Sequence, residues 1–281
     1  MSISRQDMLE RPDGTRIAYE VLGPEDATRT VVLVHGLAAA GAQFAADAMA
    51  FAARGNRVLV PDLRGHGRST RPPSDPAAQD FTIPLMTADM EALLEAEANG
   101  PVHWVGNSLG GILGLHLLAR APRRFASFAS FGTAHRLNLP RASAGSIGLA
   151  YRLFGPRLSG AITARFTTDN VAARPLVARL IAQFDPRVGM AIAQNVRRYD
   201  LLEAALGSTC PMLIIEGGRD RLVNLALARS LPQLRGRPNL THVHLKEGGH
   251  CANLDAKDAW RSTLLAFWES MDPAGGASQD L

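Results

Sequence analysis

The feature that most constrains this chain is a serine between two glycines, in residues 106–110, at a change from strand pattern to helix pattern. A short apolar strand pattern, 102–105, precedes the serine, and an apolar helical run, 109–119, follows it. This setting is typical of a nucleophile elbow, in which backbone strain lifts the serine hydroxyl above the edge of a sheet. Flanking glycines let the strand and the helix approach each other closely. The pattern therefore predicts that Ser108 is a nucleophile.

A pentad of this kind also arises by chance in glycine-rich loops, so the prediction depends on two further residues. Serine is a weak nucleophile unless a base takes its proton, and that base is usually a histidine oriented by a carboxylate. His250 lies in a glycine-rich loop after the last strand-like run, and Asp220 follows the strand-like run before it. Their order along the chain is nucleophile, acid, base. We therefore predict Ser108, Asp220 and His250 as the catalytic residues.

Two other carboxylates compete for the role of the acid. Glu216 lies within a strand pattern, where it is less able to reach a neighbouring loop, and the sequence around Asp62 indicates a turn that is hydrogen-bonded to itself.

Acyl transfer also needs hydrogen-bond donors for the oxyanion that develops on the substrate. We predict that the backbone N–H groups of Leu37 and Leu109 are these donors. The second of these lies at a helix N-terminus, which adds partial positive charge. His35 is interpreted as a structural hydrogen-bonding residue.

Strand and helix patterns alternate along the chain, which predicts an α/β fold with a parallel sheet. Strands are expected at 16–21, 30–34, 57–60, 102–105, 124–131, 212–216 and 241–245, and helices at 41–54, before 99–100, at 109–119 and at 256–271. The tail from Pro273 is expected to be frayed.

Residues 133–207 interrupt this rhythm, because they contain no convincing strand and several amphipathic helical patterns separated by prolines. We interpret them as a helical lid inserted into a core made of residues 1–132 and 208–281. Lid arginines could bind a substrate carboxylate, and we expect at most one or two of them to face the site: Arg152, Arg157, Arg165, Arg197 and Arg198.

Composition excludes several classes of protein. The 281 residues are 46% hydrophobic and 20% charged, as in a globular protein. No run approaches the roughly 20 apolar residues of a membrane helix, and the polar start carries no signal segment, so we expect a cytoplasmic protein without a membrane partner. The net charge of +4 does not indicate nucleic-acid binding, because the basic residues are dispersed and no binding motif accompanies them. Cys210 and Cys251 show no metal-ligand spacing.

Together these motifs resemble the α/β-hydrolase fold family with a helical cap, and the matching segments are 34–37, 62–69, 106–110, 218–220 and 249–250. The resemblance implies an eight-stranded, mostly parallel sheet flanked by helices, no cofactor and a two-step acyl-enzyme mechanism. Within the family, residues 32–69 resemble 3-oxoadipate enol-lactonases and related carboxylesterases. The function expected from this resemblance is hydrolysis of a small carboxylic ester or lactone.

Three other activities remain open. Residues 106–108 resemble enzymes that hydrolyse a carbon–carbon bond in ring-cleavage products, although the glycine-rich stretch of that group is replaced at 37–40 and no tryptophan follows His250. A receptor that keeps the triad without turnover, and an acyltransferase that uses an alcohol in place of water, are also compatible with the residues. The sequence does not fix the natural substrate or the oligomeric state.

Overall fold

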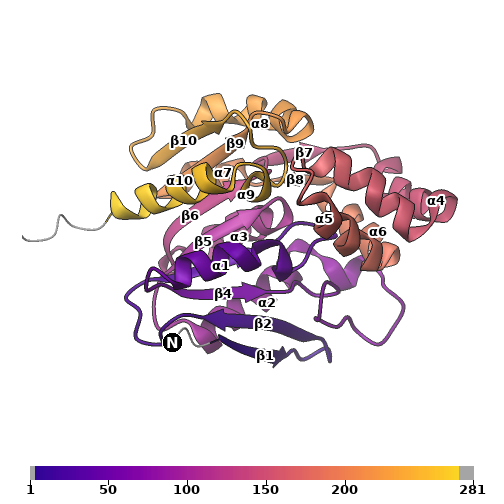
Figure 1. Cartoon of the computed structure of the whole chain (residues 1–281), viewed down its shortest axis with the longest axis horizontal. Coiled ribbons are helices and arrows are strands. Elements are labelled where there is room, and N and C mark those ends of the chain that lie inside the picture. Colours follow the sequence, from indigo (N-terminus) through magenta and orange to yellow (C-terminus); the bar gives the residue numbers. More distant parts are fainter. Residues whose placement is uncertain (1–3, 272–281) are drawn as a thin grey trace, which may run out of the picture.

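The computed structural model describes residues 4–271 of the chain, without the side chains of residues 144 and 222. The expected frayed tail from Pro273 lies outside these residues. An eight-stranded sheet forms the centre of the molecule (Figure 1). In sheet order the strands are β1 (Ser4–Glu10), β2 (Arg16–Leu22), β4 (Arg57–Pro61), β3 (Thr30–Val34), β5 (Val102–Asn107), β6 (Phe125–Phe131), β9 (Met212–Gly217) and β10 (Leu240–Leu245).

The sheet is mostly parallel, as predicted. The pairs β1–β2 and β2–β4 are antiparallel, and all pairs from β4 through β10 are parallel. Parallel neighbours need crossover connections, which helices supply here. The helices are α1 (Ala45–Ala52), α2 (Ile83–Glu97), α3 (Leu109–Arg120), α4 (Ala142–Thr167), α5 (Arg174–Gln183), α6 (Pro186–Val196), α7 (Leu202–Gly207), α8 (Arg221–Leu234), α9 (Ala252–Asp255) and α10 (Lys257–Glu269), with short 3-10 turns η1 (Gly41–Phe44), η2 (Ala78–Phe81) and η3 (Pro122–Arg124).

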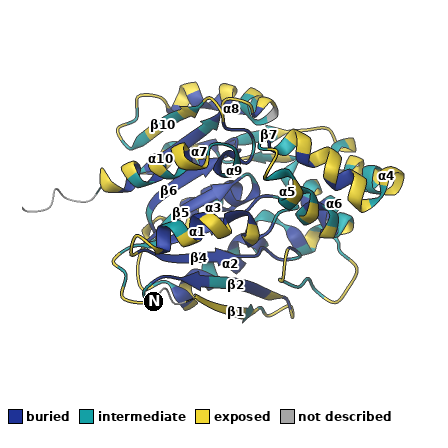
Figure 2. Cartoon of the chain, viewed as in Figure 1, coloured by how far each residue is buried: buried dark blue, intermediate teal, exposed yellow. Residues whose placement is uncertain are grey.

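Apolar side chains on both faces of the central strands explain why these strands read as continuous aliphatic runs. In β3, Val32 and Val34 pack in the cluster formed with α2, α3, α7 and α8, whereas Val31 and Leu33 pack in the cluster formed with α1 and α10. Successive side chains of a strand point to opposite faces, so a strand covered on both sides must be apolar throughout. Figure 2 shows the resulting buried centre beneath more exposed outer helices.

Between β6 and β9 the chain leaves the sheet and forms α4, α5, α6 and α7. The expectation that this segment holds no strand is wrong, because β7 (Arg136–Asn138) and β8 (Arg198–Asp200) pair antiparallel at its base. These strands have only three residues each, too few to show an alternating pattern. Helix α4 contains a kink at Gly155, which has φ +69° and precedes Pro156.

No sequence pattern predicted β1. Its side chains are almost all exposed, since it lies at the sheet edge and pairs only with β2. An exposed edge strand needs no apolar face.

Among residues 4–271, no helix is both long enough and apolar enough to cross a membrane.

Two glycine substitutions should have opposite effects on stability. A Cβ on Gly110 would lie 2.2 Å from the carbonyl oxygen of Val34, so α3 would have to move away from the sheet. We expect Gly110→Ala to lower the free energy of unfolding by at least about 2 kcal/mol. Gly145 in α4 has nothing near its Cβ position, and Gly145→Ala should raise stability by roughly 0.5–1 kcal/mol. Urea unfolding measures both, and a Gly110→Ala protein as stable as the wild type would contradict the close approach.

Candidate active site

Ser108 occupies the turn between β5 and α3 with a backbone that few residues other than glycine adopt. Its φ is +49° and its ψ is −110°. A Cβ on Gly106 would lie 2.4 Å from the nitrogen of Gly111, so only glycine lets the strand and the helix meet there. The Ser108 N–H donates to the carbonyl of Phe131 at 3.0 Å, which fixes the turn to β6. This is the strained elbow that the sequence predicted, with the serine half-buried.

Asp220 and His250 come together at the carboxyl ends of β9 and β10. The Nδ1 of His250 lies 2.8 Å from Oδ2 of Asp220, whose side chain is buried at the start of α8. When Nδ1–H of His250 donates a hydrogen bond to the Asp220 carboxylate, the lone pair of Nε2 is free to accept a proton. The other Asp220 oxygen accepts from the N–H of Val223 at 3.4 Å, so the carboxylate is held from two sides.

The competing carboxylates are engaged elsewhere. Glu216 accepts from Nε2 of His242 at 2.9 Å, within the β9–β10 pair. Asp62 accepts from the backbone N–H of Gly41 at 2.7 Å and from that of Arg68 at 2.8 Å. Asp62 therefore bonds within its own turn, as the sequence indicated, and also holds that turn against the start of η1.

Asn107, the residue before the serine, ties the elbow to the histidine loop. Its Nδ2 donates to the carbonyl of His250 at 3.0 Å and to that of Phe131 at 3.3 Å. Its Oδ1 accepts from Nε2 of Gln43 at 3.1 Å. Because Asn107 is buried, these bonds do not compete with bulk water. Ser108 and His250 are thus attached to one hydrogen-bonded unit.

That unit continues through a chain of buried polar groups behind the site. Gln43 donates to Oδ1 of Asn253 at 3.2 Å, and Nδ2 of Asn253 donates to Asp47 at 2.9 Å. Arg261 closes the chain with a 2.6 Å bond from Nε to Asp47. Burial raises the pKa of Asp47, although Asn253 and Arg261 act against that rise. Gln43 was not predicted from the sequence, because no motif marks a lone glutamine in a helical turn.

The turn after β3, which contains Leu37, lies close to the elbow. A Cβ on Gly36 would lie 3.2 Å from Cβ of Ser108, so the turn runs directly over the serine. Ala38 has φ +56°, and its N–H lies 3.3 Å from Nε2 of His66. Within residues 4–271 the N–H groups of Leu37 and Leu109 have no protein acceptor.

Two buried neutral histidines support this turn from below. His35 places Nδ1 2.7 Å from the carbonyl of Gly36, and its Nε2 accepts from the N–H of Leu63 at 3.0 Å. Burial lowers the pKa of His35 to about 4 and that of His66 to about 3. Both rings therefore stay uncharged near neutral pH. The interpretation of His35 as a structural residue is confirmed.

A cavity of about 300 Å³ lies beside the elbow, between the core and the helices that follow β6. Residues of the core contribute one wall, including Leu37, Gln43, Asn107 and His250. Helices α4 and α5 contribute the other, with mainly apolar side chains: Ile147, Tyr151, Val177, Leu180 and Ile181, followed by Phe184. The volume suits a small ligand, and the lining suits an uncharged one.

The idea that lid arginines bind a substrate carboxylate finds no support in this cavity. Among the described residues that line it there is no arginine or lysine. Arg152, Arg157, Arg165 and Arg198 are exposed, and Arg197 is half-buried beside the carbonyl of Leu139.

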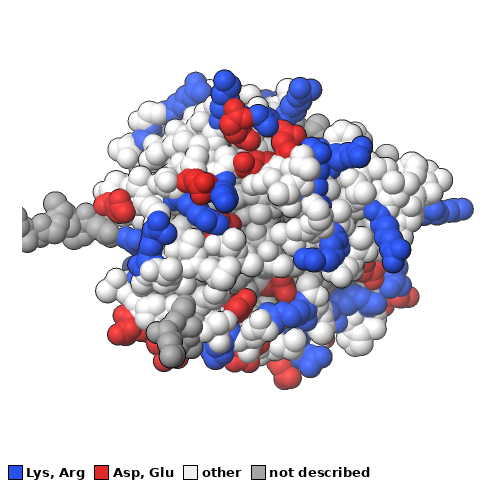
Figure 3. Space-filling model, in the orientation of Figure 1, with Lys and Arg blue, Asp and Glu red and all other residues white. Residues whose placement is uncertain are grey.

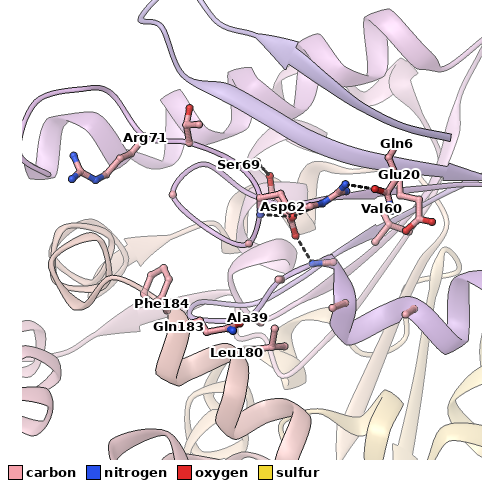
Figure 4. A pocket seen from close by; sticks show the side chains of 18 of the residues that line it. Gln6, Glu20, Ala39, Val60, Asp62, Ser69, Arg71, Leu180, Gln183 and Phe184 are labelled. Atoms are coloured by element: carbon pink, nitrogen blue, oxygen red, sulfur yellow. Dashed lines mark hydrogen bonds and ion pairs between the residues drawn. The ribbon is translucent and has the colours of Figure 1, made fainter. Parts of the chain in front are cut away.

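A second, larger hollow of about 1030 Å³ lies on the far side of a thin wall. Ala39, Leu180 and Phe184 line both the cavity and this groove, so single side chains separate the two. Figure 4 shows Ala39, Leu180 and Gln183 at one end of the groove and Gln6 at the other.

The described residues contain no cluster of His, Cys, Asp or Glu with the geometry of a metal site. Both cysteines are buried and unpaired. Burial raises the pKa of the Cys251 thiol, and it raises that of Cys210 to about 11. Neither thiol is therefore a reactive thiolate near neutral pH.

Comparison with known proteins agrees with the fold. Residues 29–160 match the model of the alpha/beta hydrolase fold family. The chain is 30% identical over 270 residues to a putative carbamate hydrolase RutD of Variovorax paradoxus, which covers 92% of this chain and 97% of the relative. It is 30% identical over 265 residues to a pimeloyl-[acyl-carrier protein] methyl ester esterase of Stenotrophomonas maltophilia, covering 88% and 95%.

Solved structures give the same result for the fold. The enol-lactonase of Burkholderia xenovorans superposes with a TM-score of 0.81 at 24% identity, over 94% of this chain and 100% of that one. The chain therefore belongs to the α/β-hydrolase fold family. The two relatives at 30% identity are hydrolases by name, which supports a hydrolase here as well.

Buried histidines should make stability fall as the pH falls below the pKa of an unfolded histidine. Burial lowers the pKa of His35, His66 and His135 from 6.5 to about 4, about 3 and about 4. Below about pH 6.5, these three histidines bind protons in the unfolded chain but stay neutral in the native protein. Each residue should then reduce the free energy of unfolding by about 1.4 kcal/mol per pH unit, until its folded pKa is reached.

Urea unfolding between about pH 7 and about pH 5 measures this slope. His135 is hydrogen-bonded to Ser230. Replacing His135 by asparagine should make the slope shallower by about 1.4 kcal/mol per pH unit, the contribution of one buried histidine. Stability that stays constant over this range, or equal slopes for the two proteins, would contradict the assignment of neutral buried rings.

Proposed function

We propose that this protein is a serine hydrolase that cleaves an uncharged carboxylic ester or lactone through an acyl-enzyme intermediate. The observation that supports this most is the 2.8 Å contact between Nδ1 of His250 and Asp220, on a loop that Asn107 binds to the elbow. The esterase and lactonase among the similar proteins support ester hydrolysis in general.

The proposed reaction has two steps. Ser108 Oγ attacks the carbonyl carbon while Nε2 of His250 takes its proton, and the oxyanion accepts bonds from the N–H groups of Leu37 and Leu109. The tetrahedral adduct collapses, and His250 gives its proton to the leaving alkoxide. Water then attacks the acyl carbon, His250 takes a proton from that water, and the proton returns to Ser108 as the acid leaves. Asp220 orients the imidazole and stabilises its cation.

The absence of a cationic side chain from the described lining favours a neutral substrate. We propose that residues 133–207 act as a cap on a core of residues 1–132 and 208–281, since α4 and α5 supply the apolar wall opposite the elbow. An apolar wall that excludes water strengthens the electrostatic interactions made with the oxyanion.

Replacing the proposed nucleophile and acid should remove activity without unfolding the protein. We expect Ser108→Ala to lower kcat on p-nitrophenyl esters by roughly 10³-fold or more, and Asp220→Asn by roughly 10³- to 10⁴-fold. The matched control is Glu216→Gln, which changes the competing carboxylate and should leave kcat within about three-fold of the wild type. Equal rates for Ser108→Ala and the wild type would refute the nucleophile.

The same kinetic assay separates the other candidate activities. Wild-type protein should turn over esters and aryl lactones repeatedly, and a ring-cleavage dienoate slowly or not at all. Preference for the dienoate would favour carbon–carbon bond hydrolysis, a single turnover would favour a receptor, and ester exchange with an added alcohol exceeding hydrolysis would favour an acyltransferase.

The thin wall at Leu180 should control the length of acyl chain that the enzyme accepts. Because His250 must protonate the leaving oxygen, the alcohol side of the ester lies at the histidine, and the acyl chain extends along the turn toward Ala39. We expect Leu180→Ala to raise the decanoate-to-acetate ratio of kcat/KM, and Leu180→Trp to lower it, each by roughly ten-fold. The two variants control for each other, and a ratio that moves in the same direction in both would contradict this path.

A further inference from the structure

Six large apolar side chains of α4 are between 38% and 85% exposed. We name these residues the apolar stripe: Leu149, Leu153, Phe154, Leu158, Ile162 and Phe166. Phe166 alone has 85% of its surface in solvent. Large apolar side chains that gather in solvent on one element often mark a surface that meets another surface.

The stripe follows from helical spacing on both sides of the kink. Leu149 and Leu153 are four residues apart before Gly155, and Leu158, Ile162 and Phe166 are four apart after it. Residues at this spacing lie on one face of a helix. After the kink, the residue that follows each stripe residue lines the cavity, namely Ser159, Thr163 and Thr167, so α4 contributes both to the cavity wall and to the exposed surface.

The charge of α4 has a single sign. The helix carries Arg152, Arg157 and Arg165 and no acidic residue. All three arginines are exposed, and within the described residues none has an ion-pair partner. Each one directly precedes a residue of the stripe. In Figure 3 the end of the molecule formed by α4 is a mostly uncharged surface with basic groups at its margin.

We propose that the apolar stripe of α4 docks on an anionic lipid surface. Apolar side chains of a basic amphipathic helix enter the boundary between headgroups and acyl chains, while arginines bind the phosphates above them. This goes beyond the proposed hydrolase activity and does not depend on it. It also departs from the expectation of no membrane partner, which considered only spanning segments.

Charge is the reason to prefer a lipid surface over a second copy of this chain. In a two-fold contact the same patch meets itself. Two α4 stripes would bring the arginines of both copies together without an acidic residue on either helix. Like charges opposed in an interface are costly, whereas anionic headgroups neutralise all three arginines.

Co-sedimentation of the full chain with vesicles tests the proposal. Vesicles of phosphatidylcholine with added phosphatidylglycerol should bind the wild type at least about ten-fold more tightly than vesicles of phosphatidylcholine alone. Leu158→Ser with Phe166→Ser should weaken binding to the anionic vesicles by at least about ten-fold. Changing all three arginines to glutamine should abolish the preference for anionic vesicles.

The matched control is Leu225→Ser, because Leu225 is 69% exposed on α8 and is not part of the stripe. This variant should bind as the wild type does. Thermal unfolding should be unchanged in every variant, since the altered side chains are exposed. Failure of the wild type to bind anionic vesicles, or equal binding by the stripe variant, would overturn the proposal. So would a dimer in sedimentation velocity that Leu158→Ser with Phe166→Ser converts to monomer.

Discussion

The rest of the site depends on the close approach of α3 to the sheet at the elbow. Gly106 and Gly110 leave no room for a Cβ against neighbouring backbone, and that contact holds Ser108 at φ +49°. A non-glycine residue in such a conformation costs roughly 1–3 kcal/mol, so it persists only where surrounding packing enforces it. Buried β-branched strands and the apolar face of α3 supply that packing. The packing that stabilises the fold thereby also fixes the position of the Ser108 hydroxyl.

Buried hydrogen bonds extend this rigidity to the other parts of the site. Asn107 holds the carbonyl of His250, Gln43 holds Asn107, and neutral His35 and His66 hold the turn that carries Leu37. A site that must stabilise charge as it develops benefits from donors that are already in place. The polar groups of this network are buried and bonded to one another, apart from Oε1 of Gln43, which has no hydrogen-bond partner among the described residues. Buried bonds fix the orientation of such groups more firmly than exposed bonds could.

Sequence patterns predicted the parts of the fold that are fully buried. The aliphatic run from Val31 to Val34 predicted a strand correctly, because both faces of this strand are covered. The elbow was also predicted correctly, because only glycine fits at its close contacts. No sequence pattern predicted the edge strand β1 or the paired strands β7 and β8, because exposed or three-residue strands need no apolar alternation. The structure brings Asp220 and His250 together as predicted, while their catalytic roles stay predictions. Gln43 could not be found, since its contacts form only after distant segments meet. Likewise, the sequence could not tell which face of α4 packs inward.

The most direct test of the account is the site of covalent acylation. The protein is mixed with a p-nitrophenyl ester, quenched in acid during the initial burst, digested and analysed by mass spectrometry. A single acyl group should form on the hydroxyl of Ser108 and disappear as deacylation proceeds. In Asp220→Asn no such adduct should form on the same timescale. An acyl group on His250 or Cys251, or turnover of the ester with no adduct on Ser108, would contradict it.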